Sequence, residues 1–205
     1  MESFEELLRQ AEIVHGHMCA GQILGVRMAL LACRRLEVDD PRGADRKKLV
    51  TFVEIDRCAT DAIGLVTGCR LGKRALKFRD WGKMAATFVH LTTGRAVRIV
   101  ALENSRELAR ERYPEIENKG QQQMRAYREL ADEELFREQW VTVDLPGREM
   151  PGYKGARVTC DECGEGVNFD RFVERVEQDG PYTTIPARRL CLSCADPELR
   201  YWRPV

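Results

Sequence analysis

The chain has 205 residues, of which 43% are hydrophobic and 32% charged, and its 33 basic and 33 acidic side chains give a formal net charge of zero. This composition is sufficient for a packed core, and the balanced charge favours neither nucleic acid nor an anionic membrane surface as a partner. No stretch approaches the roughly 18 consecutive apolar residues that cross a bilayer, and the first residues lack the basic and apolar regions of a signal peptide, so we expect a cytoplasmic protein.

The first 36 residues predict two helices joined by a glycine-flanked loop. Ser3 followed by Glu6 is a capping-box pattern, and the apolar spacing after it predicts the first helix. The loop over residues 15–21 leads to a helix over residues 22–36, which is so apolar that we expect it to be buried. Small residues four positions apart would let another backbone approach one side of this helix closely. They are Gly21, Gly25 and Ala29.

The centre of the chain predicts a sheet. Residues 48–56 are rich in β-formers and lead into a third helix, residues 59–67, which Gly68 ends. Of three further strands, the last two are joined by a hairpin turn at residues 92–95. These strands are expected at residues 75–78, 85–91 and 96–101.

The segment after residue 104 is heavily charged. It predicts helical structure as far as residue 139, and residues 140–145 predict a final strand. Prolines and glycines then indicate a linker. The expected fold class is α+β, with a mixed or antiparallel sheet and helices, followed by a small zinc-ribbon-like or treble-clef-like domain. The expected boundaries are residues 1–145 for the core domain, 146–157 for the linker and 158–205 for the small domain.

Four of the eight cysteines form two Cys-x-x-Cys pairs near the C-terminus. A two-residue spacer lets both sulfurs of a pair face one centre, and two pairs close a tetrahedral site of four thiolates around a structural zinc ion. Gly164 suits the left-handed residue of such a turn, and a hairpin with its turn at Gly180-Pro181 would bring the pairs together. Two redox dithiols or an iron-sulfur cluster are the alternatives. The predicted zinc ligands are Cys160, Cys163, Cys191 and Cys194.

The small domain is acidic. Residues 158–205 contain six Arg and nine Asp or Glu, a net charge of −3, and four thiolates around one zinc ion would add two negative charges. This charge disfavours nucleic acid as its partner and favours protein contact or domain swapping in a dimer.

A second group of metal-ligand residue types lies in the N-terminal loop. Where the chain is extended, His17 and Cys19 emerge on the same side and could bind one metal, while His15 faces away or supports the site. Imidazole and thiolate together favour zinc or another borderline transition metal. The competing interpretation is a polar turn beside a buried free thiol.

Cys58 is the natural third ligand of that site. It precedes a helix, whose free backbone amides and dipole would stabilise a thiolate and lower its pKa. Asp61 could cap the same helix or accept a proton. Cys69 lies beyond the far end of the helix, on the order of 16 Å from Cys58, and cannot hold the same ion. Cys33, on an apolar stripe, is interpreted as a core residue.

Four motifs follow one another along residues 13–90. They are His15-Gly16-His17-x-Cys19-x-Gly21 with Gly25, Asp56-x-Cys58-x-x-Asp61-Ala62-Ile63, Thr67-Gly68-Cys69 with Gly72-Lys73, and Asp80-x-Gly82-Lys83-x-Ala85. Taken in order, these motifs resemble the FmdE family of formylmethanofuran dehydrogenase subunits. Ala20 stands where the family usually has Pro. Some members carry a C-terminal zinc module, so the resemblance covers most of the chain.

The resemblance implies an α+β core, a homodimer, and a metal or active site around His17, Cys19 and Cys58. The family name refers to a tungsten- or molybdenum-dependent dehydrogenase complex whose pterin and redox centres belong to other subunits. The resemblance also singles out Lys83 within a basic segment that otherwise either binds an anion or is simply solvated. The candidate catalytic residues are Cys58, Asp61, His15 and Lys83.

Three functions remain open from the sequence. The first is a metal-binding accessory protein of C1 or formate-related metabolism. The second is a stand-alone enzyme whose open-sited metal activates water or substrate, with Asp61 or His15 transferring the proton. The third is a regulatory adaptor whose zinc module contacts a partner protein.

Overall fold

The computed structural model describes residues 1–176 and 187–203. It divides the chain into two compact units, Met1–Asp144 (unit 1) and Leu145–Val205 (unit 2). Within the described residues, no helix combines the length and the apolar character that a membrane crossing requires.

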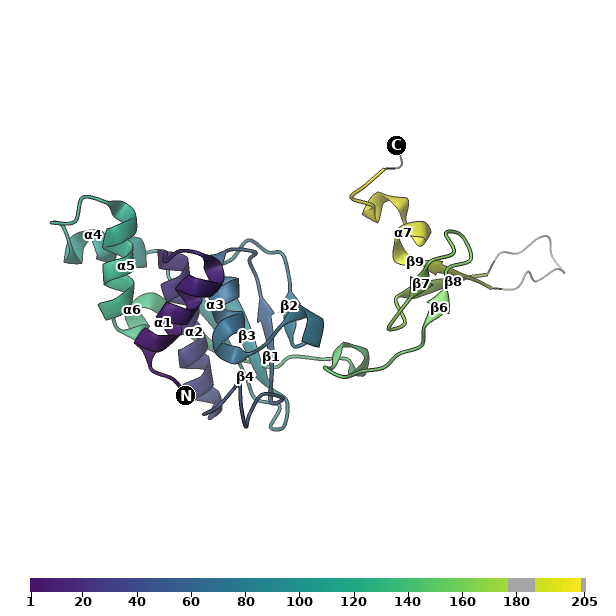
Figure 1. Cartoon of the computed structure of the whole chain (residues 1–205), viewed down its shortest axis with the longest axis horizontal. Coiled ribbons are helices and arrows are strands. Elements are labelled where there is room, and N and C mark those ends of the chain that lie inside the picture. Colours follow the sequence, from purple (N-terminus) through teal and green to yellow (C-terminus); the bar gives the residue numbers. More distant parts are fainter. Residues whose placement is uncertain (177–186, 204–205) are drawn as a thin grey trace. The chain divides into compact units, whose positions relative to one another are not determined.

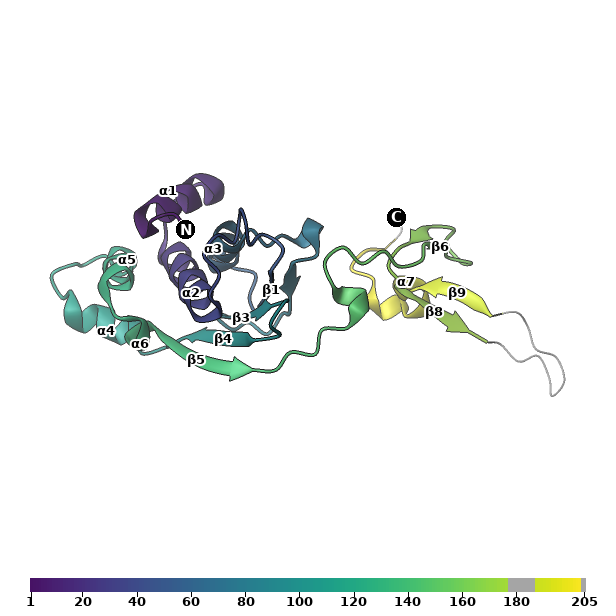
Figure 2. The ribbon, with the colours of Figure 1, turned by 90° about the horizontal axis from the view of Figure 1, so that it is seen from below.

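Unit 1 is built on a five-stranded mixed sheet in the order β2-β1-β3-β4-β5. The outer strand β2 runs parallel to β1, and the other neighbours are antiparallel. The helices lie over one face of this sheet (Figure 2). The α+β class with a mixed sheet is therefore confirmed. The strands are β1 (Leu49–Val53), β2 (Leu76–Phe78), β3 (Ala85–His90), β4 (Ala96–Ala101) and β5 (Phe136–Val141).

Local signals mark three of the helix ends in unit 1. The Ser3 side chain accepts a hydrogen bond from the backbone N–H of Glu6, and Gly16 and Gly68 end two helices with φ of 91° and 67°. The helices α1, α2 and α3 pack side by side (Figure 1). The elements are α1 (Phe4–His15), α2 (Ala20–Leu36), α3 (Cys58–Thr67), η1 (Leu71–Lys73), α4 (Ser105–Arg112), α5 (Lys119–Glu129) and α6 (Asp132–Leu135).

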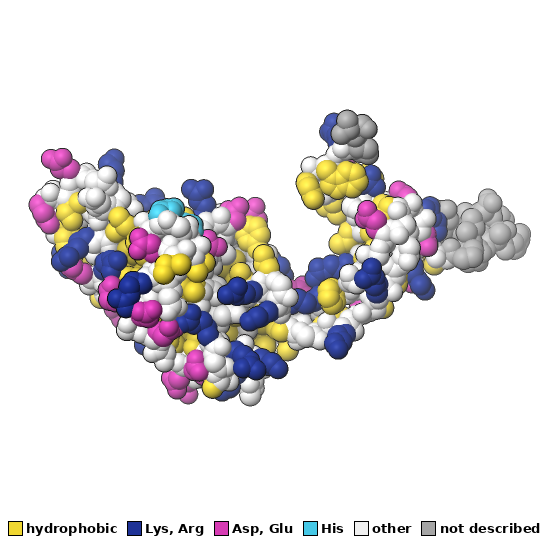
Figure 3. All heavy atoms as spheres, in the orientation of Figure 1, with side chains coloured by type: hydrophobic (Ala, Val, Ile, Leu, Met, Phe, Trp, Pro, Cys, Tyr) yellow, Lys and Arg dark blue, Asp and Glu magenta, His cyan; other side chains and the backbone are white. Residues whose placement is uncertain are grey.

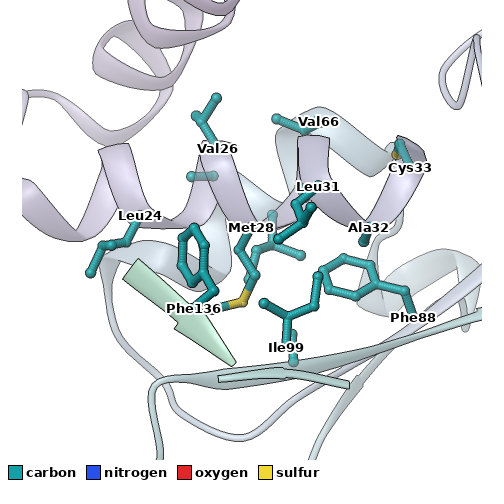
Figure 4. Packing of buried hydrophobic residues seen from close by; sticks show 14 of the residues in the cluster. Leu24, Val26, Met28, Leu31, Ala32, Cys33, Val66, Phe88, Ile99 and Phe136 are labelled. Atoms are coloured by element: carbon teal, nitrogen blue, oxygen red, sulfur yellow. The ribbon is translucent and has the colours of Figure 1, made fainter. Parts of the chain in front are cut away.

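The core of unit 1 lies between α2 and the sheet. Met28 on α2 packs among Phe88, Ile99 and Phe136 of three strands, and all four side chains are buried (Figure 4). On its other side α2 meets α3 so closely that a Cβ added at Gly25 would lie 2.5 Å from the carbonyl oxygen of Ala59. The prediction that small residues let another backbone approach α2 is confirmed. This contact holds the start of α3 beside α2.

Two expected element boundaries are wrong. The expected strand over residues 140–145 is β5, which already begins at Phe136, inside the segment that the sequence predicts as helical. The charged residues that suggest a helix are accommodated because β5 is an edge strand, and Glu138 pairs with Arg35 of α2 at 2.6 Å. The second helix begins at Ala20, two residues early, because Cys19 serves as its N-cap.

The described part of unit 2 contains two short antiparallel strand pairs, a short helix and two 3-10 turns. The expected linker contains η2 (Gly147–Glu149), and its later part is bonded to Asp170 through the Tyr153 hydroxyl and the backbone N–H of Ala156. The expected turn at Gly180-Pro181 lies outside the described residues. The other elements are β6 (Val158–Thr159), β7 (Gly166–Val167), β8 (Phe172–Arg175), β9 (Arg188–Cys191), α7 (Leu192–Ala195) and η3 (Pro197–Leu199).

Candidate metal centres

The two C-terminal cysteine pairs meet in unit 2. Their four sulfur atoms lie within 4.8 Å of one another, and those of Cys163 and Cys191 are 3.9 Å apart. Zn–S bonds of about 2.3 Å in a tetrahedron place sulfurs about 3.8 Å apart, so this spacing fits one ion. We call this group the four-cysteine cluster. Its members are Cys160, Cys163, Cys191 and Cys194.

A hairpin and a helix position the four-cysteine cluster. The turn between β6 and β7 carries the first pair, and there Gly164 has φ of 74° and donates its N–H to the carbonyl of Cys160. The left-handed residue predicted at Gly164 is confirmed. In the second pair, Cys191 is the N-cap of α7 and Cys194 lies within that helix. A turn, a hairpin and a helix start are the parts of a treble clef, which was one of the two expected forms.

The surroundings of the four-cysteine cluster lower the pKa of one thiol and raise that of another. Backbone N–H groups, first that of Cys163 and then that of Cys191, lower the pKa of Cys160 to about 6. The neighbouring Cys191 sulfur, followed by burial, raises the pKa of Cys194 to about 12. Four sulfurs this close repel one another as anions, so all four can ionise together only around a cation. The donor set therefore fits a metal ion.

A second group of ligand atoms lies where α1 meets α2. His15, His17 and Cys19 each contribute one atom, and the three atoms lie within 4.8 Å of one another. His15 is the last residue of α1 and Cys19 is the N-cap of α2, so the turn at Gly16 brings them together. We call this group the His–Cys cluster. The sequence predicted that His15 faces away from the metal or only supports the site. The structure instead brings its ring into the group, with the centres of the His15 and His17 rings 4.8 Å apart.

Asp61 connects the His–Cys cluster to α3. Its Oδ2 atom lies 2.9 Å from Nδ1 of His15, an arrangement in which the carboxylate fixes the imidazole and leaves Nε2 for a metal. The His17 side chain is exposed and Asp61 is 55% exposed, and histidine atoms reach the surface of unit 1 in Figure 3. The cluster is thus open to solvent.

Cys58, the expected third ligand, is the first residue of α3 and lies beside Cys19. Partial burial, followed by the hydrogen bond with Cys19 and the charge of that residue, raises the pKa of Cys58. The expectation of a lowered pKa is wrong because these effects outweigh the helix N-terminus. Its sulfur is not one of the three atoms grouped above. Ligation by Cys58 therefore stays a prediction.

Gln22 is a residue of this region that the sequence patterns did not single out. It is fully buried in the first turn of α2, and its Nε2 donates to the Cys58 carbonyl at 2.5 Å. Its Oε1 is buried without a hydrogen-bond partner among the described atoms, which is costly unless something polar approaches it. A hydrogen-bond donor would satisfy this oxygen, and the two imidazoles and one thiolate of the His–Cys cluster fit a transition metal ion. The one signal in the sequence was a polar Gln22 among the small and apolar residues of the first two turns of this helix.

The remaining candidate residues lie in other parts of unit 1. Lys83 is exposed on the loop before β3, with its ammonium 5.7 Å from the centre of the Trp81 ring. Cys69 is buried and accepts a hydrogen bond from the Thr51 hydroxyl at 3.5 Å. Cys33 is fully buried in the core, which confirms its interpretation as a core residue. Among the described residues, none of these three side chains belongs to the group of donor atoms at the His–Cys cluster.

Three comparisons relate the chain to known proteins. Residues 14–138 match the family model described as "FmdE, Molybdenum formylmethanofuran dehydrogenase operon". A "Probable S-adenosyl-L-methionine-binding protein" of Archaeoglobus fulgidus is 30% identical, over 92% of this chain and 52% of its own length, so the chain spans about half of that relative. The crystal structure of an FmdE-like protein of the tungsten formylmethanofuran dehydrogenase type from Syntrophus aciditrophicus is 25% identical with a TM-score of 0.63, and the match covers 97% of this chain and 95% of that one.

Proposed function

Because this chain belongs to the FmdE family, we propose that it is a metal-binding accessory protein of the formylmethanofuran dehydrogenase type. It holds a structural zinc ion at the four-cysteine cluster and a second transition metal at the His–Cys cluster. The observation that carries the proposal is the meeting of His15, His17 and Cys19 within 4.8 Å, with Asp61 bonded to His15.

The two clusters have different chemical capacities. Four thiolates fill a tetrahedral shell, so the four-cysteine cluster supports the fold. Three donors leave a position for water, substrate or a further protein ligand, and Cys58 is the nearest candidate for that ligand. A metal held there would act as a Lewis acid on whatever occupies the open position.

The chain itself fixes and exposes this position. Asp61 orients the His15 ring through Nδ1. Gln22 holds the first turn of α3 through the Cys58 carbonyl. The exposed His17 leaves the cluster accessible from solvent, as exchange with a partner protein or a substrate requires.

Metal analysis of the full chain tests the proposal. We expect two metal ions per chain, falling to one in His17→Ala and in Cys19→Ala. The matched control is Cys163→Ala, which should lose the other ion and leave the unit 1 ion in place. One ion in the wild-type protein, unchanged by His17→Ala, would contradict the second metal. Cys58→Ala then decides whether Cys58 is a ligand.

A stand-alone metal-dependent enzyme is the second candidate, favoured by the exposure of His17 and Asp61 beside three donors. It requires a metal that keeps a solvent ligand, which X-ray absorption spectroscopy of the loaded protein measures. A closed shell of four protein ligands would exclude hydrolytic chemistry at this site. S-adenosyl-L-methionine, named in the relative from Archaeoglobus fulgidus, is the first ligand to test by thermal shift.

We also propose a cytoplasmic homodimer that contacts a larger dehydrogenase or another protein rather than nucleic acid. The acidic segment over residues 158–205 supports a protein partner, including the partner of a regulatory adaptor. Light scattering of the purified chain measures the dimer, and a monomer at all concentrations would remove that part of the proposal.

A further inference from the structure

A pocket of about 110 Å³ lies in unit 1 beside the His–Cys cluster. Ala20 and Gly21 line it from the first turn of α2 and directly follow Cys19 in the sequence. A Cβ added at Gly21 would lie 3.8 Å from the Cys19 sulfur and 3.1 Å from the Cys58 Cβ. One short stretch of backbone therefore borders both the pocket and the two thiols.

The pocket has an apolar part and a polar part. Leu24, Met84 and Leu102 give it aliphatic walls from three different segments. At the polar part, the Ser105 hydroxyl donates to the Tyr127 hydroxyl at 3.3 Å, and both residues are only 2% exposed. A pocket with apolar walls that is also lined by two residues with buried hydroxyl groups is typical of a site that orients a small ligand.

Arg106 supplies a positive charge to the polar part. It lies in the first turn of α4, where the helix dipole also favours an anion. Its ion pair with Glu103 spans 3.6 Å between side chains that are 63% and 84% exposed. An exposed pair of this kind contributes little, so a ligand carboxylate can replace Glu103 on the guanidinium.

We propose that this pocket binds a short aliphatic carboxylate. The carboxylate contacts Arg106 and the two buried hydroxyl groups, and the carbon chain packs against the aliphatic walls. An apolar cavity of about 150 Å³ holds benzene, so the smaller pocket holds about four or five non-hydrogen atoms, the size of acetate or propionate. Glu103 at the same rim opposes a doubly charged phosphate and favours a singly charged ligand. The role of this ligand as substrate rests on the proposed metal centre, whereas its binding to the pocket does not.

Titration of the full chain with formate, acetate and propionate, followed by amide NMR, tests the proposal. We expect propionate to bind with a dissociation constant on the order of 1–10 mM, more tightly than formate, with shifts centred on the pocket. Arg106→Gln should weaken propionate about tenfold. The matched control is Arg110→Gln, which removes the equivalent ion pair one turn later, Arg110 with Glu107 at 3.8 Å, and should leave binding within about twofold.

Two further measurements keep the proposal distinct from the metal centre. Ala101→Leu fills the pocket and should abolish propionate binding, with the melting temperature as a check on folding. His17→Ala should lose the unit 1 metal and still bind propionate. If the protein binds two metals but propionate shifts no pocket residue, or if formate and propionate bind equally and Arg106→Gln has no effect, the carboxylate site is wrong and the proposed function stands. If propionate binds but unit 1 takes no metal, the proposed metal centre is wrong and the carboxylate site stands.

Discussion

The two metal-ligand clusters of this chain differ in what surrounds their donors. In unit 2, four sulfurs lie close enough to complete the shell of one metal ion, and the chain adds hydrogen bonds to them, such as the Cys191 N–H to the Cys160 sulfur at 3.3 Å. In unit 1, three mixed donors lie together, of which only His17 is exposed, and a carboxylate on a neighbouring helix holds His15. A complete shell supports a fold, whereas an incomplete shell leaves room for chemistry. Under the proposed function, we therefore expect chemistry at the unit 1 cluster and a structural role for the more recognisable cysteine motif.

The largest expected effect comes from breaking the four-cysteine cluster. Cys194→Ser removes a buried sulfur, and we expect unit 2 to unfold, because metal binding contributes on the order of 10 kcal/mol to the folding of small zinc modules. Unit 1 has its own core and should stay folded. Amide NMR of the full chain would show the signals of unit 2 collapse while those of unit 1 remain.

Ser193→Ala is the control for this experiment. Its hydroxyl lies 3.3 Å from the Cys191 sulfur but supplies none of the four sulfur donors, so the metal and the fold of unit 2 should be kept. A folded, metal-loaded unit 2 in Cys194→Ser would show that the four-cysteine cluster is not structural.

A smaller effect is expected where α2 meets α3, the contact that supports the unit 1 cluster. A Cβ at Gly25 would lie 2.5 Å from the Ala59 carbonyl oxygen, so Gly25→Ala must separate the two helices. We expect unit 1 to lose about 2 kcal/mol in urea unfolding, and metal affinity to fall in unit 1 but not in unit 2, since α3 carries Cys58 and Asp61.

Gly72→Ala is the matched control for Gly25→Ala. A Cβ at Gly72, in η1, would meet nothing within 4 Å, so stability should change by less than about 0.5 kcal/mol. Equal effects of the two substitutions would show that the close approach of α2 and α3 does not stabilise unit 1.

Local patterns predicted much of this molecule because they depend on local physics. The cap at Ser3, the left-handed Gly164 and the small residues facing α3 follow from backbone geometry, which the sequence carries directly. The mixed sheet, expected from β-forming segments, and the FmdE family, expected from ordered motifs, are confirmed by the strand topology and by the family model.

The wrong or missing predictions concern contacts between distant segments. The charged residues of β5 suggest a helix, because the sequence does not show that Arg35 of α2 pairs with Glu138. The position of His15 depends on Asp61, 46 residues further along the chain. Likewise, the pKa of Cys58 rises because burial and Cys19 oppose the helix terminus. None of these pairings can be obtained from spacing alone.

Asp61→Asn tests whether the carboxylate beside His15 strengthens metal binding at the unit 1 cluster alone. The substitution keeps the shape of the side chain and removes the charge that orients His15, so we expect about tenfold weaker metal binding at unit 1 and no change at unit 2. Competition with a chromophoric chelator measures both affinities. Glu12→Gln, an exposed change one turn before His15, serves as control, and equal losses at both clusters would contradict this role for Asp61.

The smallest expected effect is a difference in the pH at which acid destabilises the two units. Hydrogen bonding to Lys48, followed by the backbone N–H of Asp40, lowers the pKa of Asp45 from 3.8 to about 2. A lowered carboxyl pKa contributes stability that is full above about pH 4 and is lost as the pH falls through 2. The four-cysteine cluster should already release its metal nearer pH 6 to 4, as thiolates are protonated. Asp45→Asn should therefore lower the melting temperature of unit 1 by at most a few degrees at pH 7 and by clearly less near pH 2, whereas Asp39→Asn should be neutral at both. An equal deficit at pH 7 and pH 2 would show that the Asp45 charge does not stabilise unit 1.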